Sequence, residues 1–173
     1  MADEHTVLLA RVPTADPVVA AFGRFVPPEW DGRPYAHVTA LGPFAPPSTL
    51  TPALLHRIGA LIWTHLPVTV GLSRLEQFSD GMVWLAPDDP KPFRALTEAL
   101  WRAFPDYPPY GGQFDEVIPH LSLGRLPGSI DLEAVGTVVA PLLPLRAVVD
   151  TVQLVRWSTE RVDVLHEWAV DAP

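Results

Sequence analysis

One short pattern occurs twice in this chain, and each copy lies in a stretch of strand-forming residues. Residues 37–44 read His-Val-Thr-Ala-Leu-Gly-Pro-Phe, and residues 120–125 read His-Leu-Ser-Leu-Gly-Arg. Side chains two positions apart on a β-strand point to the same face. Each copy therefore predicts an imidazole and a hydroxyl side by side on one face of a strand. A fold that uses both copies has to bring two distant strands to one pocket.

Two such pairs around one pocket supply the groups that displacement at phosphorus requires. Histidine titrates near neutral pH, so one imidazole can be neutral while another is protonated. The neutral ring can take a proton from water, and the protonated ring can give one to the leaving oxygen. The hydroxyls can donate to the non-bridging phosphate oxygens. We expect the catalytic residues to be His37, Thr39, His120 and Ser122, with either histidine as acid or base.

The composition favours a single soluble domain. The chain has 173 residues, of which 48% are hydrophobic and 18% charged, so we expect residues 1–173 to form one domain. It has no cysteine, which excludes disulfides and thiolate metal sites. The start of the chain carries no basic leader, and the apolar stretch 7–10 is too short for a signal or membrane helix. We expect a cytoplasmic protein that does not bind membranes.

The charge and the remaining motifs exclude several classes of enzyme. A net charge of −8 argues against a broad grip on polyanions, so a nucleic acid would be held locally. A ligase with a lysine adduct would need the single lysine, Lys91, and no motif surrounds it. No zincin-type His-Glu-x-x-His and no Gly-x-Ser-x-Gly occurs. We expect no metal and no bound cofactor.

The order of predicted elements contains a faint internal repeat. Strands are expected at 5–11, 36–42, 68–75, 82–86, 119–124, 146–157 and 162–170. Helices are expected at 16–25, from 52 to about 64, from 90 to about 104 and at 131–140. In each half, a loop rich in proline and aromatic residues precedes the histidine strand, and a helix follows it. The loop 105–118 is long enough for a lid, or it is an ordinary connection.

The two motifs and the segment between them resemble the two-histidine (2H) phosphoesterase superfamily, in particular its 2′-5′ RNA ligase-like group. That group shows His-Val-Thr-Leu followed by Pro-Phe, and later Pro-His-Leu-Thr-Leu. Here the second motif reads Pro-His-Leu-Ser-Leu at 119–123, and the segment 78–87 is also similar. The resemblance spans residues 5–170. Its departures are small, because Ser122 keeps the hydroxyl of threonine and Ala40 is only smaller than usual.

The resemblance implies a fold and an activity. The fold is α+β and bilobal, with two antiparallel β-sheets around a central cleft, helices outside and a pseudo-two-fold duplication. The activity is metal-independent hydrolysis of a 2′,3′-cyclic phosphate or a 2′-5′ phosphodiester in a nucleotide or RNA end, carried out by a monomer. The same residues also fit a nucleotide-binding module that does not cleave, or 2′-5′ end-joining of RNA by the reverse reaction.

Further residues are candidates for substrate binding. Arg125 follows the second motif and could bind a phosphate through both of its terminal nitrogens, or it is a surface residue at a strand end. Five aromatic residues could stack on a base or belong to the core: Tyr35, Phe44, Trp84, Tyr110 and Trp157. Tyr35 and Tyr110 are favoured for binding because they lie in loops.

Overall fold

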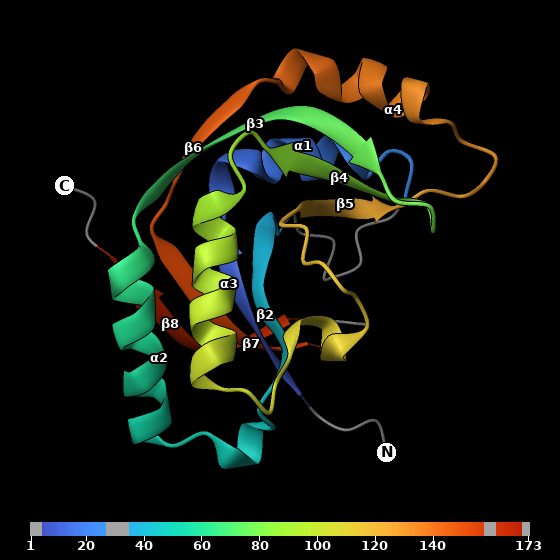
Figure 1. The fold of residues 1–173 in the computed structure, drawn as a ribbon. Coiled ribbons are helices and arrows are strands. Elements are labelled where there is room, and N and C mark those ends of the chain that lie inside the picture. Colours follow the sequence, from blue (N-terminus) through green and yellow to red (C-terminus); the bar gives the residue numbers. More distant parts are fainter. Residues whose placement is uncertain (1–4, 27–34, 158–161, 171–173) are drawn as a thin grey trace.

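The computed structural model describes residues 5–26, 35–157 and 162–170. In these residues one curled antiparallel sheet of eight strands is accompanied by four α-helices (Figure 1). The strands are β1 (Thr6–Arg11), β2 (His37–Phe44), β3 (Val68–Gln77), β4 (Met82–Pro87), β5 (Leu121–Arg125), β6 (Leu145–Val149), β7 (Thr151–Trp157) and β8 (Val162–Ala169). The helices are α1 (Asp16–Phe22), α2 (Pro52–His65), α3 (Lys91–Ala103) and α4 (Leu132–Val139).

The two histidine strands are neighbours at the centre of the sheet. The strand order is β6-β3-β4-β5-β2-β1-β7-β8. We call the first four strands the β5 half-sheet and the last four the β2 half-sheet. Within the described residues, the halves are joined by one residue pair, Val38 with Leu121. The sheet is therefore continuous where two separate sheets were predicted, because β2 and β5 are bonded to each other at this pair.

The predicted strand 146–157 is two strands, β6 and β7, with Asp150 between them. Strand β6 ends before Asp150 and β7 begins after it. The Asp150 carbonyl accepts from the backbone N–H of Val170 at 2.8 Å, and its carboxylate accepts from the Thr151 hydroxyl at 2.8 Å. On one side of this break β6 pairs with β3, and on the other side β7 pairs with β1. The chain thus passes from one half-sheet to the other at this point.

The helices begin where the sequence signals place them. Thr51 caps α2 by accepting from the N–H of Leu54, and Asp131 caps α4 by accepting from the N–H of Ala134. The buried Phe93, Leu96 and Leu100 lie at helical spacing along one face of α3. By contrast, α1 ends at Phe22 rather than Phe25.

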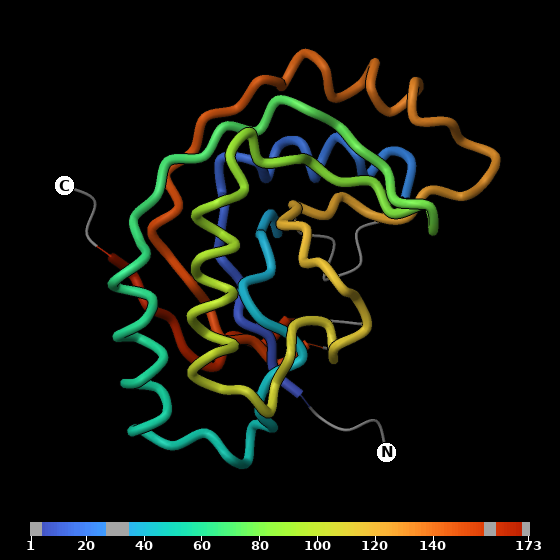
Figure 2. Tube along the Cα trace, in the orientation of Figure 1, coloured from blue at the N-terminus to red at the C-terminus, as the bar shows by residue number. Residues whose placement is uncertain are grey.

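The helices cover the two half-sheets separately. Figure 2 shows α2 and α3 side by side, and they contact β8 and β2 of the β2 half-sheet. Helices α1 and α4 pack on each other, and α1 contacts β5. No helix in the described ranges is both long and apolar enough to cross a membrane.

Candidate active site

His37 is the first residue of β2, and its ring is held by the backbone. Its Nδ1 lies 2.7 Å from the carbonyl oxygen of Tyr35, and the residue is only 5% exposed. Because a carbonyl oxygen can only accept, Nδ1 carries the hydrogen and donates it. In the neutral ring the lone pair is then on Nε2, which is the form that a general base needs.

His120 directly precedes β5 and is held in the same way. Its Nδ1 lies 2.7 Å from the carbonyl oxygen of Ile118, again two residues earlier in the chain. Both imidazoles therefore share one tautomer and one kind of anchor, although more than 80 residues separate them in the sequence. This common local geometry follows from the repeated motif.

The pairing of Val38 with Leu121 determines where the motif side chains point. Paired residues of neighbouring strands share a face, and both of these are buried, at 1% and 0% exposure. The residues before and after each of them point to the opposite face. The structure therefore brings both histidine–hydroxyl pairs to the face away from this part of the core, on adjacent strands. The half-buried members of the set are Thr39, His120 and Ser122.

The environment keeps both rings neutral in the free protein. Burial, the positive charge of Arg11 and the proximity of the His120 ring together lower the pKa of His37 from 6.5 to about 4, against the opposing effect of the Tyr35 carbonyl. Burial also lowers the pKa of His120, with the Ile118 carbonyl opposing. An anion between the rings would raise the pKa of each. The site is therefore suited to take up a proton when a phosphate binds.

Three aromatic rings surround His120. Phe78 lies edge-to-face at 5.1 Å between ring centroids, Trp84 lies at 5.7 Å, and Tyr110 is nearly parallel to the imidazole at 6.3 Å. Trp84 pairs with Ser122 across β4 and β5, which puts it on the same face as the motif hydroxyl. Phe78 is not among the residues predicted for the site from the sequence. Two signals could have indicated it: its place at the start of the segment 78–87, which resembles the superfamily, and its position at the hairpin turn that Gly81 closes.

Tyr110 connects the loop 105–118 to both motifs. Its backbone has φ +52°, a left-handed conformation that is uncommon for a residue with a side chain. This conformation accompanies a ring that covers His120 and a side-chain hydrogen bond with Thr39. Burial raises the pKa of Tyr110 to about 12, so its hydroxyl stays protonated. The loop is thus part of the site and more than a connection.

The other predicted binding residues lie in different surroundings. Trp157 is edge-on to His37 at 5.5 Å, and it borders a cavity of about 220 Å³ together with Thr39 and Tyr110. Tyr35 lies at 5.9 Å from His37 and places its hydroxyl at Gln153. A hollow of about 700 Å³ adjoins this cavity, and the two share His5 and Pro43.

Phe44 and Arg125 contact side chains outside the two motifs. Phe44 is 2% exposed and packs against Phe104 and Tyr107, with centroids 5.4 and 4.8 Å away. Arg125 is exposed and forms an ion pair with Asp80 at 2.9 Å, at the β3–β4 turn. Among the residues placed by the structure, no group of three or more His, Asp and Glu side chains could hold a metal ion.

A curled antiparallel sheet with two histidine–hydroxyl pairs at its centre defines the class of the 2H phosphoesterases, whose members act on phosphodiester bonds. The model of one family, the 2′-5′ RNA ligase superfamily, matches residues 12–161. Because this match covers most of the chain, the protein belongs to the 2′-5′ RNA ligase superfamily, and the predicted resemblance is confirmed.

Solved structures share the fold at low sequence identity. Escherichia coli LigT in complex with 3′-AMP is 15% identical with a TM-score of 0.61, over 98% of this chain and 99% of LigT. The protein TT0787 of Thermus thermophilus is 18% identical with a TM-score of 0.67, over 95% of this chain and 97% of that one. A structure described as a phosphoesterase is 16% identical with a TM-score of 0.61, over 98% and 99%. No protein of curated function matches this sequence.

Proposed function

We propose that this protein is a metal-independent phosphodiesterase that hydrolyses a 2′,3′-cyclic phosphate or a 2′-5′ phosphodiester of a nucleotide or RNA end. The observation that carries the proposal is the matched anchoring of His37 and His120, each with Nδ1 on the carbonyl two residues earlier. This anchoring leaves both Nε2 atoms for proton transfer. The same match between the two motifs supports a pseudo-two-fold arrangement of the site.

The chemistry needs one proton taken and one proton given. A water molecule attacks phosphorus as one Nε2 accepts its proton, and the bond to the ribose oxygen breaks as the other imidazolium donates a proton there. The negative phosphate supports this state because it raises the pKa of whichever ring is protonated. Thr39 and Ser122 donate to the non-bridging oxygens, where charge gathers.

The surroundings support a nucleotide as the substrate. Tyr110 and Trp157 border the small cavity beside Thr39, where their rings can stack on a base. LigT, which shares the fold, has been crystallised with 3′-AMP. Tyr35, Phe44 and Arg125 do not line this cavity, and their side chains contact Gln153, Tyr107 and Asp80 respectively.

The direct test is turnover in the presence of EDTA. Purified protein is offered 2′,3′-cyclic nucleotides and 2′-5′ dinucleotides, alongside His37→Ala and His120→Ala. We expect turnover by the native protein and a large loss in both variants. No turnover of any substrate, or unchanged turnover in the variants, would contradict the proposal. Calorimetry with AMP distinguishes the alternative, because binding without turnover would indicate a nucleotide-binding module.

A further inference from the structure

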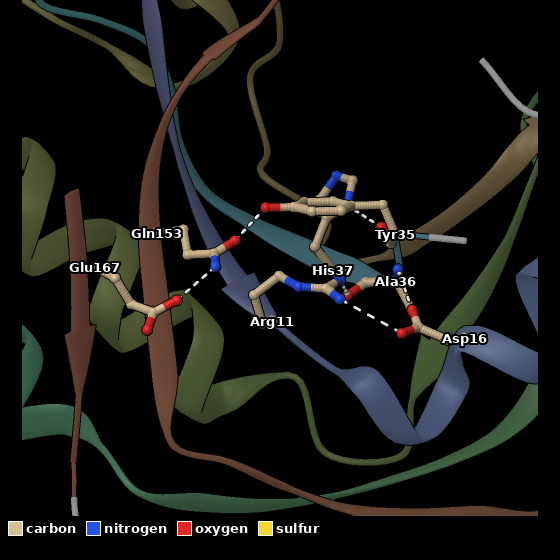
Figure 3. Close-up of polar contacts among 7 residues, drawn as sticks. All are labelled: Arg11, Asp16, Tyr35, Ala36, His37, Gln153 and Glu167. Carbon is tan, nitrogen blue, oxygen red and sulfur yellow. Dashed lines mark hydrogen bonds and ion pairs between the residues drawn. The ribbon is translucent and has the colours of Figure 1, made fainter. Parts of the chain in front are cut away.

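Two charged residues outside the motifs bond to the backbone of Ala36, the residue before His37. The N–H of Ala36 donates to Oδ1 of Asp16 at 2.7 Å, and the carbonyl of Ala36 accepts from Nη1 of Arg11 (Figure 3). Arg11 and Asp16 form an ion pair at 3.5 Å. One ion pair therefore bonds to both polar backbone groups of Ala36, the residue between Tyr35 and His37, and the Ala36 carbonyl also accepts from the backbone N–H of Val12 at 2.9 Å.

Tyr35 is held at both ends of its side chain. The guanidinium of Arg11 lies over its ring at 4.0 Å, and its hydroxyl donates to Oε1 of Gln153. Gln153 in turn donates from Nε2 to Glu167 at 2.5 Å, as Figure 3 shows. These contacts connect Tyr35 to β1, β7 and β8. They fix the residue whose carbonyl accepts from Nδ1 of His37.

Sequence explains why the first motif needs this support. In the second motif the residue before the histidine is Pro119, which has a fixed φ and no N–H to satisfy. In the first motif that position is Ala36, which is fully buried and has an N–H. A buried N–H without an acceptor costs about 1–3 kcal/mol. Asp16 therefore provides an acceptor for the Ala36 N–H, whereas Pro119 has no N–H and needs none.

We propose that Arg11 and Asp16 are positioning residues for His37: by fixing the Ala36 peptide they keep the Tyr35 carbonyl on Nδ1 and aim Nε2 at the substrate phosphate. The kinetic part of this inference rests on the proposed function. The tautomer part does not, because it concerns the free protein. Both residues bond to the backbone beside His37, and the charge of Arg11 also lowers the pKa of His37, so the imidazole tautomer is the readout that reports positioning alone.

The test combines the imidazole tautomer with kinetics in Asp16→Ala and Asp16→Asn. Long-range ¹H–¹⁵N NMR of the histidine rings is expected to show His37 as a single Nδ1–H tautomer in the native protein and a mixture in Asp16→Ala. The kcat of Asp16→Ala is expected to fall roughly 10- to 100-fold with little change in KM, since small displacements of a reacting group cost about that much. Asp16→Asn keeps an acceptor oxygen. Compared with Asp16→Ala, it is expected to restore most of the kcat and most of the single Nδ1–H tautomer of His37.

Arg57 provides a matched control, because it makes the same kinds of contact elsewhere. It lies over the ring of Phe104 at 4.8 Å and donates to the carbonyl of Ala103 at 2.8 Å. Arg57→Gln is expected to leave kcat and the His37 tautomer unchanged, whereas Arg11→Gln is expected to alter both. Arg11→Gln also serves if Asp16→Ala does not fold, because it leaves the bond from Ala36 to Asp16 intact.

The outcomes separate the two proposals. A single His37 tautomer and native kcat in folded Asp16→Ala, or in Arg11→Gln if that variant alone folds, would overturn the positioning role. If the native protein turns over no substrate but Asp16→Ala still shows a mixture of His37 tautomers, the positioning role is supported and the proposed phosphodiesterase activity is overturned. The signals of His120 serve as an internal reference, because its anchor is the separate carbonyl of Ile118.

Discussion

Val38 pairs with Leu121 where the two half-sheets meet, and each of these residues directly follows a candidate catalytic histidine. The residue pair that joins the two half-sheets therefore also sets how the two imidazoles are aligned with each other. Both paired side chains are buried in the core. A change in packing at this pair is expected to reach the site without touching any group that contacts a phosphate.

Leu121→Ala is expected to lower the free energy of unfolding by about 2–5 kcal/mol, because it leaves a cavity at a fully buried position. Urea unfolding measures the loss. The matched control is Leu165→Ala on β8, where the side chain is 38% exposed and the expected change is within about 0.5 kcal/mol. Equal effects at the two positions would contradict the role of the junction.

Stability is expected to fall as the pH drops from about 6.5 towards 4, because of His37. Its pKa is lowered to about 4 in the folded protein, so between these values the unfolded chain binds the proton more readily. The full contribution is on the order of 3 kcal/mol. Denaturant unfolding at several pH values measures it, and His37→Gln is expected to flatten the dependence. A dependence of equal steepness in that variant would show that other groups cause it.

The pH profile of kcat/KM is expected to be bell-shaped with its maximum below about 6.5, since this parameter reports the free protein, in which the pKa values of both His37 and His120 are lowered. The profile of kcat is expected to move to higher pH, because the bound phosphate raises the pKa of the acid. Steady-state rates across the range measure both. A flat profile from about pH 5 to 9 would be inconsistent with acid–base catalysis.

A substrate whose leaving group needs no proton is expected to distinguish the acid from the base. With a p-nitrophenyl phosphodiester, the variant that lacks the acid is expected to recover activity relative to the ribose substrate, while the variant that lacks the base is not. The comparison uses His37→Ala and His120→Ala on both substrates. Recovery in both variants, or in neither, would exclude separate roles for the two rings.

Tyr110→Phe and Tyr110→Ala are expected to separate the two functions of this side chain. The first removes only the hydroxyl that bonds to Thr39, and kcat is expected to fall while KM changes little. The second also removes the ring over His120, and KM is expected to rise by the equivalent of about 1–3 kcal/mol if the ring stacks on a base. Identical kinetics in the two variants would mean that the ring makes no contact with the substrate.

The motif residues could be placed from sequence because their arrangement is local. A period of two puts each histidine beside its hydroxyl, and the apolar residue between them, Val38 or Leu121, identifies the opposite face. The β3–β4 hairpin was also predictable, since Asp80 and Gly81 form its turn and Gly81 has φ +90°. These features depend on neighbours within a few positions.

The features that sequence did not predict depend on long-range contacts. Nothing local to Asp150 indicates that the strands on either side of it join different half-sheets. Phe78 lies against His120 only because β4 pairs with β5. The contacts of Arg11 and Asp16 with Ala36 are equally remote in sequence, at 25 and 20 positions. Hydrophobic patterning carries no signal for any of these pairs.

The crossing at Asp150 has a consequence for how the protein is made. Residues before the second motif provide two strands to each half-sheet, and residues from β5 onward provide the other two to each. A nascent chain that has just left the ribosome as far as His120 therefore holds no finished half of the sheet. A product that ends before the second motif lacks two strands of each half-sheet in the described residues, as well as one of the two histidines, and is expected to be inert.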